Sequence, residues 1–145
     1  MPLEPEHRFY QKYKDQGLPE SEARYASMIE GMDKSLDDIL NYVDEKGIAD
    51  NTIIIFMSDN GGLSAQARAG KPHTHNAPLN SGKGSAYEGG IREPMLVRWP
   101  GVTKAGSSCN QYIIIEDFFP TILSLANVKA AKKVQHVDGI SFTGL

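Results

Sequence analysis

A carboxylate and an amide stand side by side where an apolar run ends. Residues 52–57 (TIIIFM) are followed by Ser58, Asp59, Asn60 and two glycines. A run without polar alternation predicts a strand covered on both faces, as in a parallel sheet, and ligands of such sheets bind beyond the carboxyl ends of strands. Asp59 and Asn60 offer the hard oxygen atoms that Ca²⁺ and Mg²⁺ bind. The same residues are also ordinary turn chemistry, so this stretch alone leaves a cation site and a plain turn both open.

A single lysine sits between two glycines further along the chain, in SGKGS at residues 81–85. In so open a loop, Lys83 can act as a compact point charge on an oxyanion. The stretch is not a nucleotide-binding phosphate loop, because Ala77 and Gly84 occupy the places where that motif requires Gly and Ser or Thr. Taken alone, it is also typical of a surface turn with a solvated lysine.

The elements that must position these residues follow from periodicity and from helix and strand breakers. Apolar residues at helical spacing predict a helix over residues 19–46, with Pro19 at its start and Gly47 as its stop. A second strand is predicted over 95–99, a short extended piece over 112–115 and a helix over 117–126. Residues 1–18 are polar and weakly patterned, which predicts a segment that either covers a surface or hangs loose.

A long polar loop separates the two candidate groups, from Gly62 to Leu79. Loops of this length are usually functional or disordered. His73 and His75 form H-x-H, but two ligands fall short of the four that structural zinc normally takes. A plain exposed loop is nearly as well supported as a binding role.

Composition and charge give no support to several kinds of partner and of covalent link. The chain has 145 residues and a net charge of −3, with no long run of either sign. This gives no electrostatic case for binding nucleic acid or an anionic membrane. No apolar stretch is long enough to span a bilayer, and the one cysteine, Cys109, excludes an internal disulfide.

Three motifs, taken together, point to one protein family. SDNGG, PLNSGKGSAYEGGIREP and LVRWPG together resemble the sulfatase family, within the alkaline-phosphatase-like superfamily. The resemblance implies an α/β fold of mostly parallel strands flanked by helices, present here in part. Residues 1–145 would form one piece of the catalytic domain, its carboxyl-side part. The nucleophile-bearing part and the small carboxyl-terminal domain would lie outside these residues.

The resemblance also implies roles for individual residues. Asp59 and Asn60 match the pair that completes a divalent-cation site, usually calcium, and Lys83 matches the lysine that contacts the sulfate. The family nucleophile, a formylglycine made within C-x-P-x-R or C-x-A-x-R, has no counterpart in this chain, since Cys109 lies in SSCNQYI. The polar loop borders the substrate pocket in the family. We therefore predict substrate-facing roles for the following residues of the loop: Lys71, His73, His75 and Asn76.

The implied activity is hydrolysis of a sulfate monoester on a sugar or aryl group by the parent protein, with no nucleic acid or membrane partner. The 145 residues alone are expected to be inactive and to self-associate through an exposed sheet edge. Relatives of the bacterial type are usually periplasmic or secreted. Two alternatives stay open: a phosphate or phosphonate monoester hydrolase of the same superfamily, and a non-catalytic binding module on the same scaffold.

Overall fold

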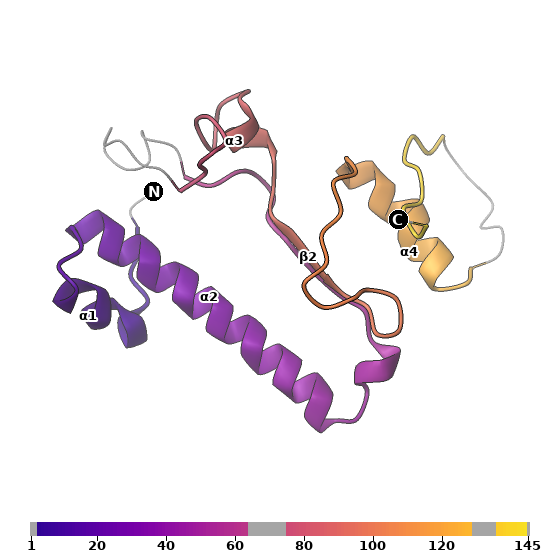
Figure 1. Cartoon of the computed structure of the whole chain (residues 1–145), viewed down its shortest axis with the longest axis horizontal. Helices are drawn as coiled ribbons and strands as arrows, with labels where there is room; N and C mark the ends of the chain where they lie inside the picture. Colours follow the sequence, from indigo (N-terminus) through magenta and orange to yellow (C-terminus); the bar gives the residue numbers. More distant parts are fainter. Residues whose placement is uncertain (1–2, 64–74, 129–135, 145) are drawn as a thin grey trace. The chain divides into compact units, whose positions relative to one another are not determined.

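The computed structural model describes residues 3–63, 75–128 and 136–144. The chain forms two compact units, Met1–Lys104 and Ala105–Leu145. The first unit contains the following elements (Figure 1): α1 (His7–Asp15), α2 (Glu20–Glu45), the 3₁₀ turn η1 (Ala49–Asn51), β1 (Ile54–Met57), α3 (Glu88–Ile91) and β2 (Met95–Arg98). The second contains the 3₁₀ turn η3 (Ile115–Asp117) and α4 (Phe118–Leu125).

The long helix α2 confirms the prediction from periodicity to within a residue at each end. Pro19, with φ of −55°, precedes its first turn. Gly47 ends it in the left-handed region at φ 66°, where glycine avoids the steric cost of a side chain. Of its apolar residues Val43 is buried, whereas Ile29 and Ile39 are 44% and 54% exposed. Within the described residues, much of the predicted apolar stripe is therefore uncovered.

Residues 1–18, for which the sequence indicated no helix, contain α1. The Glu6 carboxylate accepts a hydrogen bond from the Arg8 backbone N–H at 3.1 Å and so caps the helix. Lys12 and Lys14 lie in the last turn, where positive charge suits the helix dipole. The helix packs on α2 (Figure 1), which is tertiary support that local sequence does not display.

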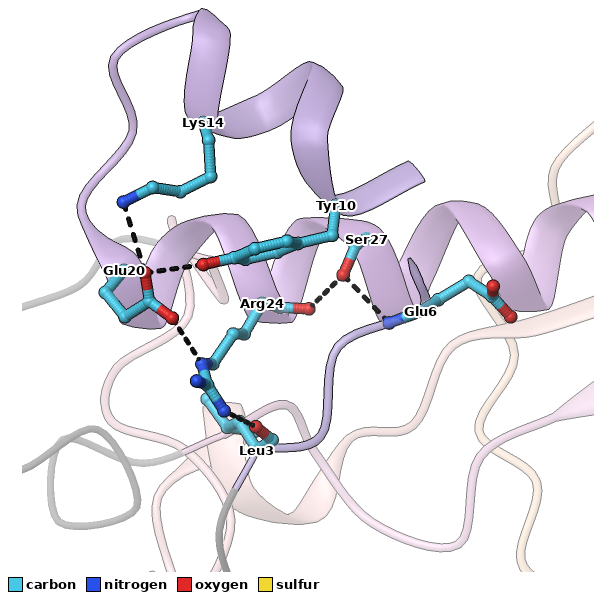
Figure 2. Close-up of polar contacts among 7 residues, drawn as sticks. All are labelled: Leu3, Glu6, Tyr10, Lys14, Glu20, Arg24 and Ser27. Atoms are coloured by element: carbon cyan, nitrogen blue, oxygen red, sulfur yellow. Dashed lines mark hydrogen bonds and ion pairs between the residues drawn. The ribbon is translucent and has the colours of Figure 1, made fainter. Parts of the chain in front are cut away.

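Glu20, in the first turn of α2, holds the two helices together (Figure 2). Its carboxylate accepts from the Tyr10 hydroxyl at 2.5 Å and the Arg24 Nε at 2.7 Å, and pairs with Lys14 Nζ at 3.1 Å. The Tyr10 hydrogen bond, helped by those of Arg24 and Lys14, lowers the pKa of Glu20 to about 2. The carboxylate is therefore charged throughout the physiological range.

A second polar connection passes through Ser27, which is fully buried. Its hydroxyl accepts from the Glu6 N–H at 3.1 Å and donates to the Arg24 carbonyl at 2.7 Å (Figure 2). The segment that leads into α1 is thus fixed to the first third of α2 by Ser27 and by Arg24, whose Nη1 donates to the Leu3 carbonyl at 3.0 Å.

The two strands lie side by side (Figure 1) and pair antiparallel, with Ile54 opposite Arg98 and Met57 opposite Met95. The predicted strand positions are confirmed, but the expected mostly parallel sheet is not what the described residues form. A continuous apolar run does not encode strand direction, and β1 is half-buried along its whole length. Arg98 Nη2 also bonds Asp44 Oδ1 at 2.5 Å, which ties β2 to the end of α2.

The second unit is organised by two polar side chains at the start of α4. Asp117 accepts from the backbone N–H groups of Ile140 at 2.8 Å and Ile114 at 3.0 Å. Thr121, 1% exposed, donates to the Asp117 carbonyl at 2.6 Å and accepts from the Phe142 N–H at 3.0 Å. These bonds attach residues 140–142 to the helix.

The sequence-based prediction for this second unit was right in part. The helix expected over residues 117–126 is confirmed by α4, but residues 112–115 form no strand. Within α4, Ile122 is 53% exposed. Phe118 is half-buried, and its ring meets the Phe142 ring edge-on with 5.2 Å between the ring centroids.

Replacing Ser27 by alanine should lower the free energy of unfolding by about 1–3 kcal/mol, because the Glu6 N–H loses its acceptor. Urea denaturation of the Ser27→Ala variant measures this loss. Ser35→Ala is the matched control in the same helix, since exposed Ser35 only donates to the Gly31 carbonyl, and it should stay within about 0.5 kcal/mol of the parent. Equal losses in both variants would contradict the assignment.

Asp117 should make the free energy of unfolding depend on pH in the acid range. Backbone hydrogen bonds from Ile140 and Ile114 lower the pKa of Asp117 below its ordinary 3.8. A carboxyl group with a lowered pKa stabilises the folded state at pH values above its ordinary pKa. This contribution is lost as the pH falls through the pKa of the folded state. Asp117→Asn should therefore lose less stability than the parent between neutral pH and values below 3.8. Thermal unfolding of the second unit over that range checks this, with Glu116→Gln expected to follow the parent curve.

Candidate functional site

Asp59 and Asn60 lie directly beyond β1, at the carboxyl end of the strand. The Ser58 hydroxyl donates to the Asn60 carbonyl at 2.9 Å, and Asn60 Nδ2 donates to Asp59 Oδ1 at 2.9 Å. Asp59 is exposed and Asn60 is half-buried. Because the Asn60 amide bonds Asp59 through its nitrogen, its side-chain oxygen keeps its accepting capacity. The turn therefore presents a carboxylate and an amide oxygen together.

Lys83 lies in a tight loop before α3. Ser81 and Gly84 flank it with φ of 63° and 87°, and the Ser85 N–H closes a turn on the Gly82 carbonyl at 3.1 Å. The Lys83 side chain is exposed. It makes no ion pair or hydrogen bond to any residue that the structure describes, so within that set its charge is uncompensated.

The two loops are joined through their backbones. The Gly61 N–H donates to the Gly90 carbonyl at 2.9 Å, and the Lys83 N–H donates to the Gly62 carbonyl at 2.6 Å. A Cβ at Gly61 would overlap the Gly89 carbonyl, and one at Gly82 would lie 2.7 Å from the Gly62 oxygen. Glycines are therefore needed for the loops to approach this closely. The structure brings Asp59, Asn60 and Lys83 onto adjoining loops.

The four residues predicted to face substrate fall into two groups. Lys71 and His73 lie outside the described residues. His75 Nε2 lies 3.1 Å from Glu22 Oε2, and its ring meets the Tyr25 ring edge-on at 5.1 Å. Asn76 Nδ2 donates to the Gly62 carbonyl at 3.3 Å and the Ser81 carbonyl at 3.0 Å. Both described residues contact the protein, and their substrate role stays a prediction.

Glu88, at the start of α3, and Arg92, which follows this helix, form an ion pair at 3.2 Å. Both side chains are more than half exposed, so the pair contributes little stability. Neither residue joins the candidate site through a contact with the described residues.

The donor set suits part of a calcium site. Calcium takes about six to eight oxygen ligands, and Asp59 with Asn60 supplies adjacent hard oxygens. Among residues 3–63, 75–128 and 136–144, no group of three or more His, Cys, Asp or Glu side chains could hold a metal. The pair therefore fits such an ion only as a share of a larger ligand set.

Sequence reasoning missed two features of this site. One is the bridging position of Asn76, whose acceptors are backbone carbonyls with no sequence signature. The other is the mutual packing of glycines, for which the pairs Gly61-Gly62 and Gly89-Gly90 were an available signal, because paired glycines mark close backbone approach.

This chain has relatives among known protein families and curated proteins. Residues 2–128 match the sulfatase family. A sulfatase of Formosa agariphila is 36% identical over 135 residues, which is 86% of this chain and 23% of that protein. An N-acetylgalactosamine-6-sulfatase of Rattus norvegicus is 41% identical over 117 residues, 81% of this chain and 22% of that protein. The chain thus spans less than a quarter of the length of these curated relatives.

A solved structure is similar to this chain over most of its length. The crystal structure of Ps i-CgsB in complex with k-i-k-neocarrahexaose is similar with a TM-score of 0.81 and 32% identity, covering 97% of this chain and 29% of that one. The described residues form part of that fold, here mostly helical with one small antiparallel sheet. No helix in the described part of the chain has the length and apolar character needed to cross a membrane.

Family match, sequence identity and fold agree, and residues 2–128, which match the family, include both the loop with Asp59 and Asn60 and the loop with Lys83. The chain belongs to the sulfatase family.

Proposed function

We propose that this chain supplies the cation-binding pair and the sulfate-binding lysine of an enzyme that hydrolyses sulfate monoesters. The observation that carries the proposal is the joining of the two loops: the Lys83 N–H bonds the Gly62 carbonyl at 2.6 Å, only two residues beyond Asn60. The backbone segments that carry the lysine and the pair of hard oxygen ligands are therefore bonded to each other. That is a suitable arrangement for an anionic ester bound beside a divalent metal.

The reaction cleaves the bond between sulfur and the ester oxygen. An attacking oxygen forms the new bond to sulfur, the alcohol leaves with a proton, and sulfate is released. Lys83 would bind the sulfate oxygens and neutralise charge that builds on the departing oxygen. Its side chain has no competing partner among the described residues, so it is available for that role.

Asp59 and Asn60 would hold calcium together with ligands from outside the described set. Bound calcium would act as a Lewis acid and keep the attacking oxygen close to sulfur. The nucleophile implied for the family, a formylglycine, has no counterpart in these 145 residues. We therefore expect the intact protein to be active and these residues alone to be inactive.

We infer that the substrate is a sulfated sugar or an aryl sulfate. Relatives are named N-acetylgalactosamine-6-sulfatase and arylsulfatase J, and the similar structure holds a neocarrahexaose. These names support a sulfate ester and leave the organic group open. Residues of the polar loop, Lys71, His73, His75 and Asn76, are the proposed determinants of that group. Assay of the intact protein on matched sulfate and phosphate esters tests the class, and cleavage of the phosphate ester alone would replace the sulfatase proposal.

Lys83→Ala in the intact protein should lower kcat/KM for a sulfate ester by about 10²–10³-fold, as loss of one charge-stabilising donor does elsewhere. Steady-state kinetics measures the effect. Lys46→Ala is the matched control, because Lys46 is also exposed and follows α2 in the same unit. A loss below threefold at Lys83, or equal losses in both variants, would remove Lys83 from the site.

Asp59→Ala should raise the calcium concentration needed for half-maximal activity after chelation. Removing even an outer partner of a metal ligand typically costs about 10–100-fold in affinity, and a charged ligand should cost at least as much. Titration of the chelated enzyme with CaCl₂ measures this shift. Asp50→Ala, an exposed carboxylate in η1, should leave the titration unchanged. An unaltered calcium requirement in Asp59→Ala would exclude Asp59 as a ligand.

A further inference from the structure

Asn76 connects the loop that carries Asp59 and Asn60 to the loop that carries Lys83. Its Nδ2 donates to the Gly62 carbonyl at 3.3 Å and to the Ser81 carbonyl at 3.0 Å. A side-chain amide has two N–H groups, so both are used. Because both partners are carbonyl oxygens, only this orientation of the amide can make the bonds.

The Gly62 carbonyl is shared by two donors. Besides Asn76, it accepts the Lys83 backbone N–H at 2.6 Å. A carbonyl oxygen has two lone pairs and can take both bonds. The Asn76 amide and the Lys83 backbone therefore meet on one oxygen atom, two residues after Asn60. Movement of Asn76 would disturb the same carbonyl that fixes Lys83.

The amide is enclosed as well as bonded. A Cβ at Gly62 would collide with Asn76 Oδ1, and a Cβ at Gly82 would lie 2.7 Å from Asn76 Nδ2. The space on both sides exists because both positions are glycine. With both N–H groups used and its oxygen against Gly62, the amide faces the protein backbone.

We infer that Asn76 is a positioning residue, which sets the place of Lys83 relative to Asp59 and Asn60 through the Gly62 carbonyl. This role differs from the substrate contact that the sequence suggested for Asn76. It rests on the proposed function only for its catalytic consequence, since the backbone geometry stands without it.

The test compares Asn76→Asp with Asn80→Asp in the intact protein. The first variant replaces both donors by acceptors. The second makes the same chemical change in the same loop at an exposed side chain that bonds no described residue. Hydrogen–deuterium exchange with site-resolved mass spectrometry follows the Lys83 amide. It should exchange about five- to tenfold faster in Asn76→Asp, the factor expected for loss of one supporting hydrogen bond. Asn80→Asp should match the parent.

Kinetics supply the second readout. A misplaced Lys83 should lower kcat about 10–100-fold with a smaller change in KM, whereas a merely structural loss would lower the amount of folded enzyme and leave kcat per folded site unchanged. If the parent hydrolyses no sulfate ester, the proposed function fails, and the exchange rate still decides the role of Asn76. Parental exchange at Lys83 in Asn76→Asp would overturn the inference. Asn76→Ala removes the same donors without adding charge and replaces Asn76→Asp if that variant does not fold.

Discussion

Close contact between glycine-bearing loops is the constraint on which the candidate site depends. Gly61 lies against the Gly89 carbonyl, and Gly82 lies against the Gly62 and Leu63 carbonyls, at distances that admit no Cβ. Backbone hydrogen bonds from Gly61 and Lys83 use this proximity. Loops interlocked in this way cannot slide past one another without breaking bonds to buried carbonyls. The spacing between the loop with the cation ligands and the loop with the lysine thus depends on these backbone contacts and on the Asn76 amide, which shares the Gly62 carbonyl.

The link from this site to the helices runs through α2. Glu20 at its start binds Tyr10, Arg24 and Lys14 in the Figure 2 cluster. Half a turn later, Glu22 contacts His75 at 3.1 Å, next to Asn76. The Glu22 and Tyr25 side chains at the first two turns of α2 therefore contact the loop that leads to Lys83, through His75. The amino-terminal end of α2 is thus the part of this helix that contacts the loop next to the candidate site.

Sequence was a good guide wherever a local signal existed. Residue spacing and Gly47 located α2, and apolar runs located both strands. The roles of Asp59, Asn60 and Lys83 stay predictions. Sequence reasoning was insufficient where tertiary contacts decide the structure. It did not identify α1, which depends on contacts with α2, or the direction of the strands, which depends on the path of the intervening loop. Sequence reasoning did not identify the hydrogen bonds of Asn76 to the Gly62 and Ser81 carbonyls, because a donor to backbone carbonyls leaves no sequence pattern. Lys71 and His73 lie outside the described residues, so their predicted roles stay predictions.

The uncovered side of α2 has a thermodynamic consequence. Among the described residues the buried apolar side chains are Ala23 and Val43, whereas Met32 and Tyr42 are 45% and 58% exposed. The heat capacity change of unfolding scales with the apolar surface that unfolding newly exposes to water. Surface already wet in the folded chain adds nothing to that change. In calorimetry these 145 residues should therefore show a small heat capacity increment, a flat stability curve and a broad melting transition.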